Sequence, residues 1–481
     1  MGAAFSLLFS RDREDLLSAL PDDVLLSILA RVDLRTAART SVLSTRWRRL
    51  PWSIPELDID VKDFMSDPHS RRNEAGGIHG AMLAITAATK SLFAKPTRES
   101  TIARLQLTLY LDDTFSCDIG QLVCDAIDCG QLKDLELAIL GEKICWEYSP
   151  PDMLRRSQDM DGFFRAYPSA LGCLTRLSLC SLSFVGLDMH HILFDCCKQL
   201  THLALISCDA GLDGPWKIDA PNSKLRVMDL DRCRFGTIQL ISLPKLEKVN
   251  WVFCVSQHVP LSFGFVPSLK ELCLAHFLYP DQHLLKLSEL LHAAAGIHIL
   301  TLDFIGKTIW LQLEIKQLAS AFSKLKKLSI LGVFVEFDLL WTTAFLRAAP
   351  SVEILHIQVY EPCEMEHMHS PWRAHKRTDP QWKPHFRGSK NLFLRELHID
   401  HFRPLKQQLT FIRAILERAP NLQMVFLNKD GEKCGQCDAM ASNESPSASA
   451  WPTFPKTEEE QDMVVRRVTD DKSFSGRIIF Q

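Results

Sequence analysis

The chain of 481 residues is too long for one compact core, and its length corresponds to about three domains. A formal net charge of −3, with 23% charged and 46% hydrophobic residues, gives no basic excess that would indicate nucleic-acid binding. No stretch approaches the roughly 20 consecutive apolar residues of a membrane-spanning helix, and the start of the chain lacks a secretory signal. Because the 15 cysteines are an odd number in such a chain, we expect reduced thiols and a cytoplasmic or nuclear location.

Residues 1–15 are expected to form a disordered leader. The first six residues fit the N-myristoylation pattern, in which Gly2 would carry the acyl chain. So short a match arises by chance, and a single myristoyl chain anchors a protein only marginally. The sequence therefore favours an unmodified leader and leaves acylation of Gly2 open.

Residues 16–53 have the pattern of a small helical module with a partner-binding face. Pro21 suits the first turn of a helix, where Asp22 and Asp23 meet the positive end of the helix dipole. The apolar residues that follow cover a wider arc than one packing face needs. A segment this short buries little surface by itself, so the surplus indicates a site for a partner. The alternative is a cap that packs only against its own chain.

The order of landmarks from Leu20 to Leu50 resembles an F-box. It runs from Leu-Pro through an apolar helix to Arg-Thr-Ser-Val-Leu-Ser and Arg-Trp-Arg. In that family, a three-helix module docks onto the Skp-type adaptor of a cullin–RING ubiquitin ligase. The resemblance implies that the adaptor is bound by Leu20, Pro21, Val24, Leu25, Ile28, Leu29, Val42, Leu43 and Trp47.

A repeat follows a linker that we expect at residues 54–98, with a polar part at 66–80 and a helix at 81–93. From residue 99 to 430, the template Leu-x-x-Leu-x-Leu recurs with conservative replacements. Its copies begin at Ile102, Leu132, Leu174, Leu200, Leu225, Leu246, Leu269, Ile297, Leu325, Val352, Leu394 and Leu422. Most neighbouring copies begin 21 to 30 residues apart, which is typical of leucine-rich repeats. The longer gaps after Leu132 and Val352 indicate insertions.

Three cysteines support the repeat. Cys208, Cys233 and Cys254 each occupy the position of the template where a small buried side chain follows the strand. We therefore expect them to be core residues rather than metal ligands or redox groups.

The segments between the strands predict an α/β fold. Helices are expected at 118–129, 186–197, 281–295, 311–322, 337–348 and 407–419. By contrast, 211–224, 236–245 and 255–268 contain Pro and Gly and are poor in helix formers. The predicted architecture is the helical module followed by a leucine-rich-repeat solenoid. A parallel sheet forms its concave face, and helices and irregular segments form its convex face.

The C-terminal part has two predicted regions. Residues 391–430 contain Leu394-Arg395-Glu396-Leu397-His398-Ile399-Asp400-His401-Phe402, a helix and Glu417–Leu422. They are similar to the FBD region that ends many plant F-box proteins with leucine-rich repeats, and we expect them to close the last repeats. Residues 431–481 are expected to form a flexible loop at 431–456, a helix at 458–468 and a strand at 477–480.

Candidate chemistry is sparse. Cys434 and Cys437 form a single C-x-x-C pair without a second pair, and they are read as loop thiols. The segment 363–375 is rich in Cys, Glu and His, but its spacing matches no metal motif. Basic residues among aromatics continue to Lys390; this stretch is either a solvated loop or a contact for nucleic acid or an acidic partner. We predict no metal, no cofactor and no catalytic residue, so the chain is not expected to be an enzyme.

The combined pattern predicts a substrate-recognition subunit of an SCF-type cullin–RING E3 ubiquitin ligase. Its F-box would hold the Skp-type adaptor and, through it, a cullin scaffold, while the repeats would hold a target protein for ubiquitination. The alternatives are a non-catalytic repeat scaffold and a small-molecule-sensing receptor with the same architecture. Nucleic acid is not an expected partner, and the sequence does not identify the target.

Overall fold

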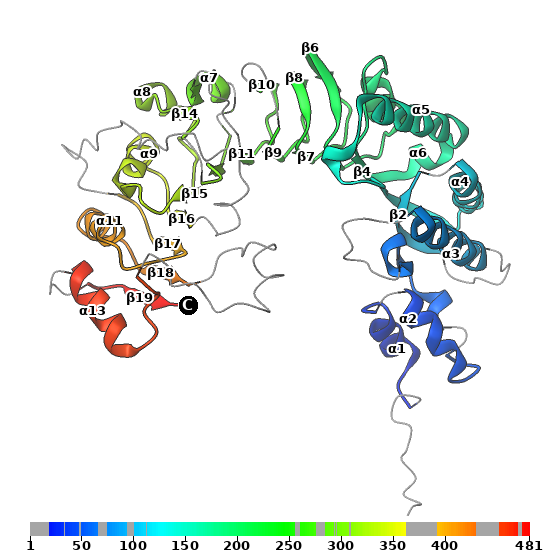
Figure 1. Cartoon of the computed structure of the whole chain (residues 1–481), viewed down its shortest axis with the longest axis horizontal. Helices are drawn as coiled ribbons and strands as arrows, with labels where there is room; N and C mark the ends of the chain where they lie inside the picture. Colours follow the sequence, from blue (N-terminus) through cyan, green and yellow to red (C-terminus); the bar gives the residue numbers. More distant parts are fainter. Residues whose placement is uncertain are drawn as a thin grey trace, which may run out of the picture. The chain divides into compact units, whose positions relative to one another are not determined.

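The computed structural model describes most of the chain and divides into two compact units. Unit 1 comprises Met1–Ser181 with Asp195–Gln199, and unit 2 comprises Leu182–Phe194 with Leu200–Gln481. The described residues are 19–32, 34–47, 50–65, 75–93, 101–111, 113–254, 260–275, 284–292, 294, 296–306, 309–361, 392–429, 452–469 and 474–481 (Figure 1).

Unit 1 begins with a helical module. Its elements are α1 (Asp22–Leu29), α2 (Leu34–Arg39) and the 3-10 turns η1 (Thr40–Val42) and η2 (Leu50–Ser53). Pro21 immediately precedes α1, and two aspartates occupy the first turn, as the sequence predicts. Among the described side chains of this module, Leu25, Leu29, Ala37, Trp47 and Leu50 are the buried apolar ones. The module therefore has a small core of its own.

The rest of unit 1 pairs parallel strands in the order β1-β2-β3-β4. The strands are β1 (Glu56–Asp60), β2 (Ile102–Tyr110), β3 (Leu132–Leu140) and β4 (Leu174–Cys180). The helical elements are η3 (Val61–Phe64), α3 (Ala75–Phe93), α4 (Asp113–Asp128), η4 (Cys145–Glu147), α5 (Pro150–Ala166) and α6 (Pro168–Cys173). Helix α3 packs against α4, which in turn packs against α5 and α6.

Strand β1 lies in the segment that the sequence predicted to be a linker. The physical reason is one more copy of the repeat template, Ile54-x-x-Leu57-x-Ile59. All three of its apolar side chains are buried, and β1 pairs with β2 over five residue pairs. The strand pairing of unit 1 thus starts directly after the helical module.

Helices α5 and α6 account for the insertion predicted between β3 and β4. A capping box starts α5, in which Ser149 and Asp152 satisfy each other's backbone amides. Arg156 of α5 is buried, and its Nη2 donates hydrogen bonds to the carbonyls of Leu140 (2.7 Å) and Cys180 (3.3 Å). The guanidinium therefore ties the inserted helix to the ends of both strands.

Unit 2 is built on parallel strands in the order β5-β7-β9-β11-β13-β15-β16-β17-β18-β19. They are β5 (His202–Ile206), β7 (Val227–Asp231), β9 (Lys248–Val252), β11 (Glu271–Ala275), β13 (Ile299–Asp303), β15 (Lys327–Phe334), β16 (Ile354–Tyr360), β17 (Glu396–Asp400), β18 (Met424–Asn428) and β19 (Arg477–Phe480). From β5 to β18, each strand begins two residues after a predicted copy of the template. Two buried apolar side chains alternate with outward residues along most of them, which is the two-residue period of a strand.

A second parallel sheet in unit 2 corrects the prediction of an irregular convex side. It contains β6 (Asp209–Asp219), β8 (Arg234–Ser242) and β10 (Leu261–Phe265) in the order β10-β8-β6. Gly236 and Gly264 lie against carbonyl oxygens of the neighbouring strand, where a Cβ atom would approach to 2.8 Å and 2.5 Å. These glycines permit close strand pairing, whereas the sequence interpretation took them as signs of irregular structure.

The helical elements of unit 2 lie on one side of the main sheet (Figure 1). They are η5 (His191–Cys196, a π-helix that ends in unit 1), α7 (Leu287–Leu291), α8 (Ile315–Leu318), η6 (Leu339–Thr342), α9 (Thr343–Ala348), α11 (Lys406–Leu416) and α13 (Glu458–Thr469). Helices α7 and α8 are shorter than predicted, because the short strands β12 (Leu285–Lys286) and β14 (Leu311–Gln312) pair there instead. The C-terminal helix and strand are found where the sequence predicted them.

The turn after several strands has a repeated conformation. Ser207, Arg232 and Phe253 directly follow β5, β7 and β9, and each has a positive φ of 51–53°. A buried cysteine comes next in each case, as predicted. The thiol of Cys233 donates to the carbonyl of Leu205 at 3.1 Å, and burial raises its pKa well above the usual value. Each cysteine therefore satisfies a strand end inside the core.

This burial predicts a selective pattern of alkylation. Iodoacetamide should modify the exposed Cys117 and Cys129 in the native protein and leave Cys233 unmodified, because only an accessible thiolate reacts. Peptide mass spectrometry after timed alkylation would measure each rate. Alkylation in guanidinium chloride is the control, in which all three thiols should react. Reaction of native Cys233 as fast as Cys129 would contradict the packing described.

Candidate binding surfaces

The helical module exposes part of its apolar surface. Val24 and Ile28 lie one turn apart on α1 with exposed fractions of 39% and 40%. Val42 and Leu43, at the end of η1, are 84% and 64% exposed. Pro21 is exposed and Leu20 is half-buried. These six residues define the apolar patch of the module.

The other three residues predicted to bind the adaptor are buried. Leu25 and Leu29 occupy the inward face of α1, and Trp47 is buried as well. Asp22 at the start of α1 pairs with Arg46 at 2.6 Å, and Arg46 also bonds to the carbonyl of Leu20. Leu25, Leu29 and Trp47 therefore support the apolar patch from below.

A second surface is the face of the unit 2 sheet away from the helices. The strand registers align one position of each strand into a row across this face, and all of its members except the buried Ser329 are half-buried. From β5 to β18 the row contains Ala204, Asp229, Asn250, Cys273, Thr301, Ser329, His356, His398 and Phe426. The row is mainly polar at its start and aromatic at its end.

The aromatic end of the row is held by a hydrogen-bonded cluster. His398 stacks on Phe426 with ring centroids 4.4 Å apart. His356 Nε2 donates to Asp400 Oδ2 at 2.6 Å, and Asn428 Nδ2 donates to Asp400 Oδ1 at 2.7 Å. A carboxylate can only accept, so the proton of His356 lies on Nε2. Three neighbouring strands are thereby cross-linked through one carboxylate.

The cluster changes the acidity of Asp400. Burial of the carboxyl raises its pKa, but the hydrogen bonds from His356 and Asn428 and the charges of His356 and His401 outweigh burial, so the pKa lies below the usual 3.8. A pKa that is lower in the folded state means that the carboxylate contributes stability above pH 3.8. This contribution is lost as the pH falls from 3.8 through the folded-state value.

Sequence reasoning did not single out this cluster. His398 and Asp400 lie within the segment quoted as FBD-like, but their partners come from strands more than twenty residues away. The signal was the outward position of each strand: His356, His398 and Phe426 stand at the same place in three successive templates. Only the register shows that they are neighbours.

Several candidates named from the sequence lie outside the described residues. They are Cys434 and Cys437, the Cys-, Glu- and His-rich segment from Cys363 to His375, and the basic residues up to Lys390. Within the part of the chain that the structure describes, no three His, Cys, Asp or Glu side chains gather into a possible metal site. No described helix is both long and apolar enough to cross a membrane.

Two protein-family models match the chain. The F-box domain matches residues 17–54, and the family described as At1g61320/AtMIF1, LRR domain, matches residues 164–456, more than half of the chain. The chain belongs to this leucine-rich-repeat family. Together with its relatives, these matches show a plant F-box protein with leucine-rich repeats, and they confirm the resemblance and the predicted α/β fold class.

The relatives match over short stretches. The F-box/FBD/LRR-repeat protein At5g22700 of Arabidopsis thaliana is 31% identical over 117 residues, which are 24% of this chain and 23% of that protein. The putative F-box/FBD/LRR-repeat protein At5g22670 of the same plant is 36% identical over 94 residues, 20% of this chain and 18% of that protein. The matches thus span less than a quarter of these relatives' length.

A solved structure also matches at a low level. It is a chain of the Toll–Spatzle complex from Drosophila, 12% identical, with a TM-score of 0.23 over 71% of this chain and 59% of that chain. A score this low adds nothing to the fold assignment.

The Asp400 cluster predicts a pH-dependent loss in the Asp400→Asn variant. At pH 7 its free energy of unfolding should be lower than that of the wild type by about 1 kcal/mol or more, because the amide keeps one acceptor oxygen for two donors and the hydrogen bond that remains is no longer charge-assisted. The difference should shrink as the pH falls below 3.8. Urea unfolding from pH 7 to values below 3.8 measures it. The exposed Asp219→Asn change is the matched control and should have no effect, whereas an Asp400→Asn variant as stable as wild type at pH 7 would contradict the prediction.

Proposed function

We propose that this protein is the substrate-recognition subunit of an SCF-type cullin–RING E3 ubiquitin ligase. The helical module binds the Skp-type adaptor, which brings the cullin scaffold, and the repeats bind a target protein. The observation that supports adaptor binding is the apolar patch of the module. Val24, Ile28, Val42 and Leu43 stay exposed although the core beneath them is filled.

Burial of this patch supports a stable complex. Full burial of a Val, Leu or Ile side chain contributes roughly 1.5–3 kcal/mol, and partly exposed side chains contribute less. Several such anchors are sufficient for specific binding when water is excluded around them. The ion pair of Asp22 with Arg46 holds the start of α1, so the patch is formed before the partner arrives.

The sheet of the repeats supports the second part of the proposal, which is binding of a target protein. Each parallel strand places outward residues on the open sheet face, and neighbouring strands combine them into a continuous surface for a target protein. The protein itself holds the target near the ubiquitin-charged enzyme and so raises its effective concentration. Bond-making chemistry is supplied by the partners.

The proposal predicts loss of adaptor capture when the patch is charged. An Ile28→Lys, Leu43→Lys double variant should retain less than a tenth of the wild-type capture of a Skp-type adaptor and cullin, because two ammonium groups would be buried in the interface. Co-purification of the full chain with both partners measures capture. The melting temperature should stay close to that of the wild type, since both side chains are exposed.

The matched control carries the same changes at exposed leucines of unit 1 outside the patch. Leu83→Lys on α3 with Leu154→Lys on α5 should leave capture unchanged. Leu25→Ala should instead lower the free energy of unfolding by about 2–5 kcal/mol, as a core truncation does. No capture by folded wild type would overturn the proposal, and capture of the adaptor without the cullin would favour a scaffold without ligase activity.

A further inference from the structure

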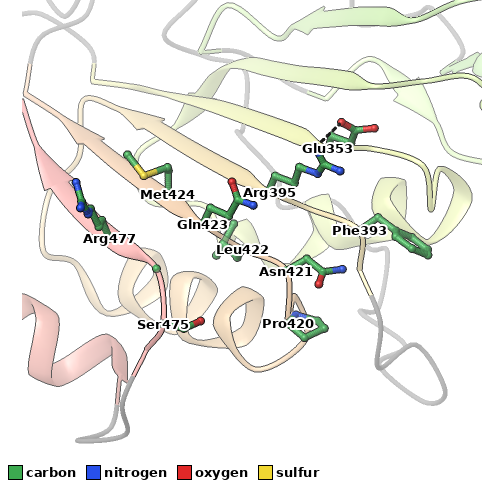
Figure 2. Close-up of a pocket in the computed structure, with 11 residues that line it drawn as sticks. Glu353, Phe393, Arg395, Pro420, Asn421, Leu422, Gln423, Met424, Ser475 and Arg477 are labelled. Atoms are coloured by element: carbon green, nitrogen blue, oxygen red, sulfur yellow. Dashed lines mark ion pairs between the residues drawn. The ribbon is translucent and has the colours of Figure 1, made fainter.

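A cavity of about 600 Å³ opens at the edge of the unit 2 sheet where β17, β18 and β19 begin (Figure 2). Its walls come from residues that precede these strands and from the first residues of β18 and β19. The cavity volume lies in the range of sites for small molecules. This edge lies at the opposite end of the strands from Asp400, the last residue of β17.

Two guanidinium groups line this cavity. Arg395 lies 3.9 Å from Glu353, and Glu353 is already bound by Lys326 at 2.5 Å. The hydrogen bond from Lys326 lowers the pKa of Glu353, so its carboxylate is charged and shared between two cations. The guanidinium of Arg477 forms no ion pair with any described residue. The cavity is therefore net cationic.

Farther along the same edge of the sheet, two cations are matched by carboxylates. Arg226 pairs with Glu247 at 3.0 Å, and Lys248 pairs with Glu271 at 3.3 Å. At the cavity, Lys326 and Arg395 share the single carboxylate of Glu353, and Arg477 has no carboxylate partner among the described residues. An incoming anion would complete the pairing that the chain leaves incomplete there.

The strand register sets the spacing of the two arginines. Glu396 of β17, Met424 of β18 and Arg477 of β19 are aligned, so Arg395 and Arg477 flank β18. Two strand spacings separate their backbones by roughly 10 Å. Figure 2 shows Gln423 and Met424 between the two arginines. A ligand lying across β18 would meet a guanidinium on each side.

The wall on the far side from Arg477 is apolar. Phe393 lines the cavity with Pro420, and its side chain is 57% exposed. A large aromatic side chain near two separate guanidinium groups suits a ligand that combines oxyanions with an apolar group. Free small anions lack the apolar part, and an acidic peptide supplies both.

We propose that this cavity binds an acidic peptide segment of the target protein. Its oxyanions contact Arg395 and Arg477, and an adjacent apolar side chain packs on Phe393. The inference rests on the part of the proposed function that assigns a target protein to the repeats. It names the class of segment that the repeats recognise, and it does not depend on the adaptor.

Fluorescence anisotropy with labelled peptides tests the inference on the full-length protein. A short peptide of alternating Glu and Leu should bind the wild type, and binding should weaken as salt is added. The same peptide with Gln in place of Glu should bind at least tenfold more weakly. A third peptide with phosphoserine in place of Glu distinguishes the two sources of oxyanion: tighter binding assigns a phosphorylated segment, and equal or weaker binding assigns a carboxylate-rich one.

Variants locate the site. Arg395→Glu with Arg477→Glu should weaken binding of the Glu peptide at least tenfold, and Phe393→Ser should weaken it to a smaller extent. Lys217→Glu with Lys316→Glu changes the net charge equally on exposed residues outside the cavity and should leave binding unchanged. Equal loss in both double variants, or no binding of any peptide to wild type, would overturn the inference. Adaptor capture, measured in parallel, should be unaffected in every variant. Failure of the wild type to capture the adaptor would count against the adaptor-binding part of the proposed function and not against this inference.

Discussion

Backbone pairing between successive parallel strands is the constraint on which unit 2 depends. A strand of five residues with two inward side chains can neither bury them nor satisfy its own amides, so each repeat needs both neighbours. The pairing holds every strand in one register, and the residues before each strand repeat the same hydrogen bonds to the preceding repeat. The Asp400 cluster and the cationic cavity both follow from this register, because their members come from separate repeats.

The sequence predicted the main strands well because their physical signal is local. The template Leu-x-x-Leu-x-Leu, in which one apolar residue is followed three and five residues later by two more, is sufficient to identify each strand. The copy at Ile54 was overlooked because its position between two predicted regions suggested a linker. The second sheet was missed for another reason: its strands contain Gly236 and Gly264, whose role is visible only from the carbonyl oxygens opposite them.

The binding surfaces were less predictable than the fold. Helical spacing alone cannot decide which pair of α1 is exposed and which is buried. Val24 with Ile28 and Leu25 with Leu29 are both one turn apart. The surrounding turns decide, because η2 with its buried Leu50 packs against the helix. The residues of the cavity are still harder to predict from the sequence, since Glu353, Arg395 and Arg477 are far apart in the chain and share no motif. Their grouping exists only once the strands are paired.

The capping and anchoring of α5 have a consequence for how such a chain diversifies. A residue added within a strand would turn every later side chain of that strand to the opposite face, so a change of strand length would disrupt the core. The connection between β3 and β4 instead accommodates two whole helices, with Arg156 as a clamp on both strand ends. Insertions are therefore accommodated in the connections between strands and not within the strands. Related chains can vary greatly in size and still keep an unbroken ladder.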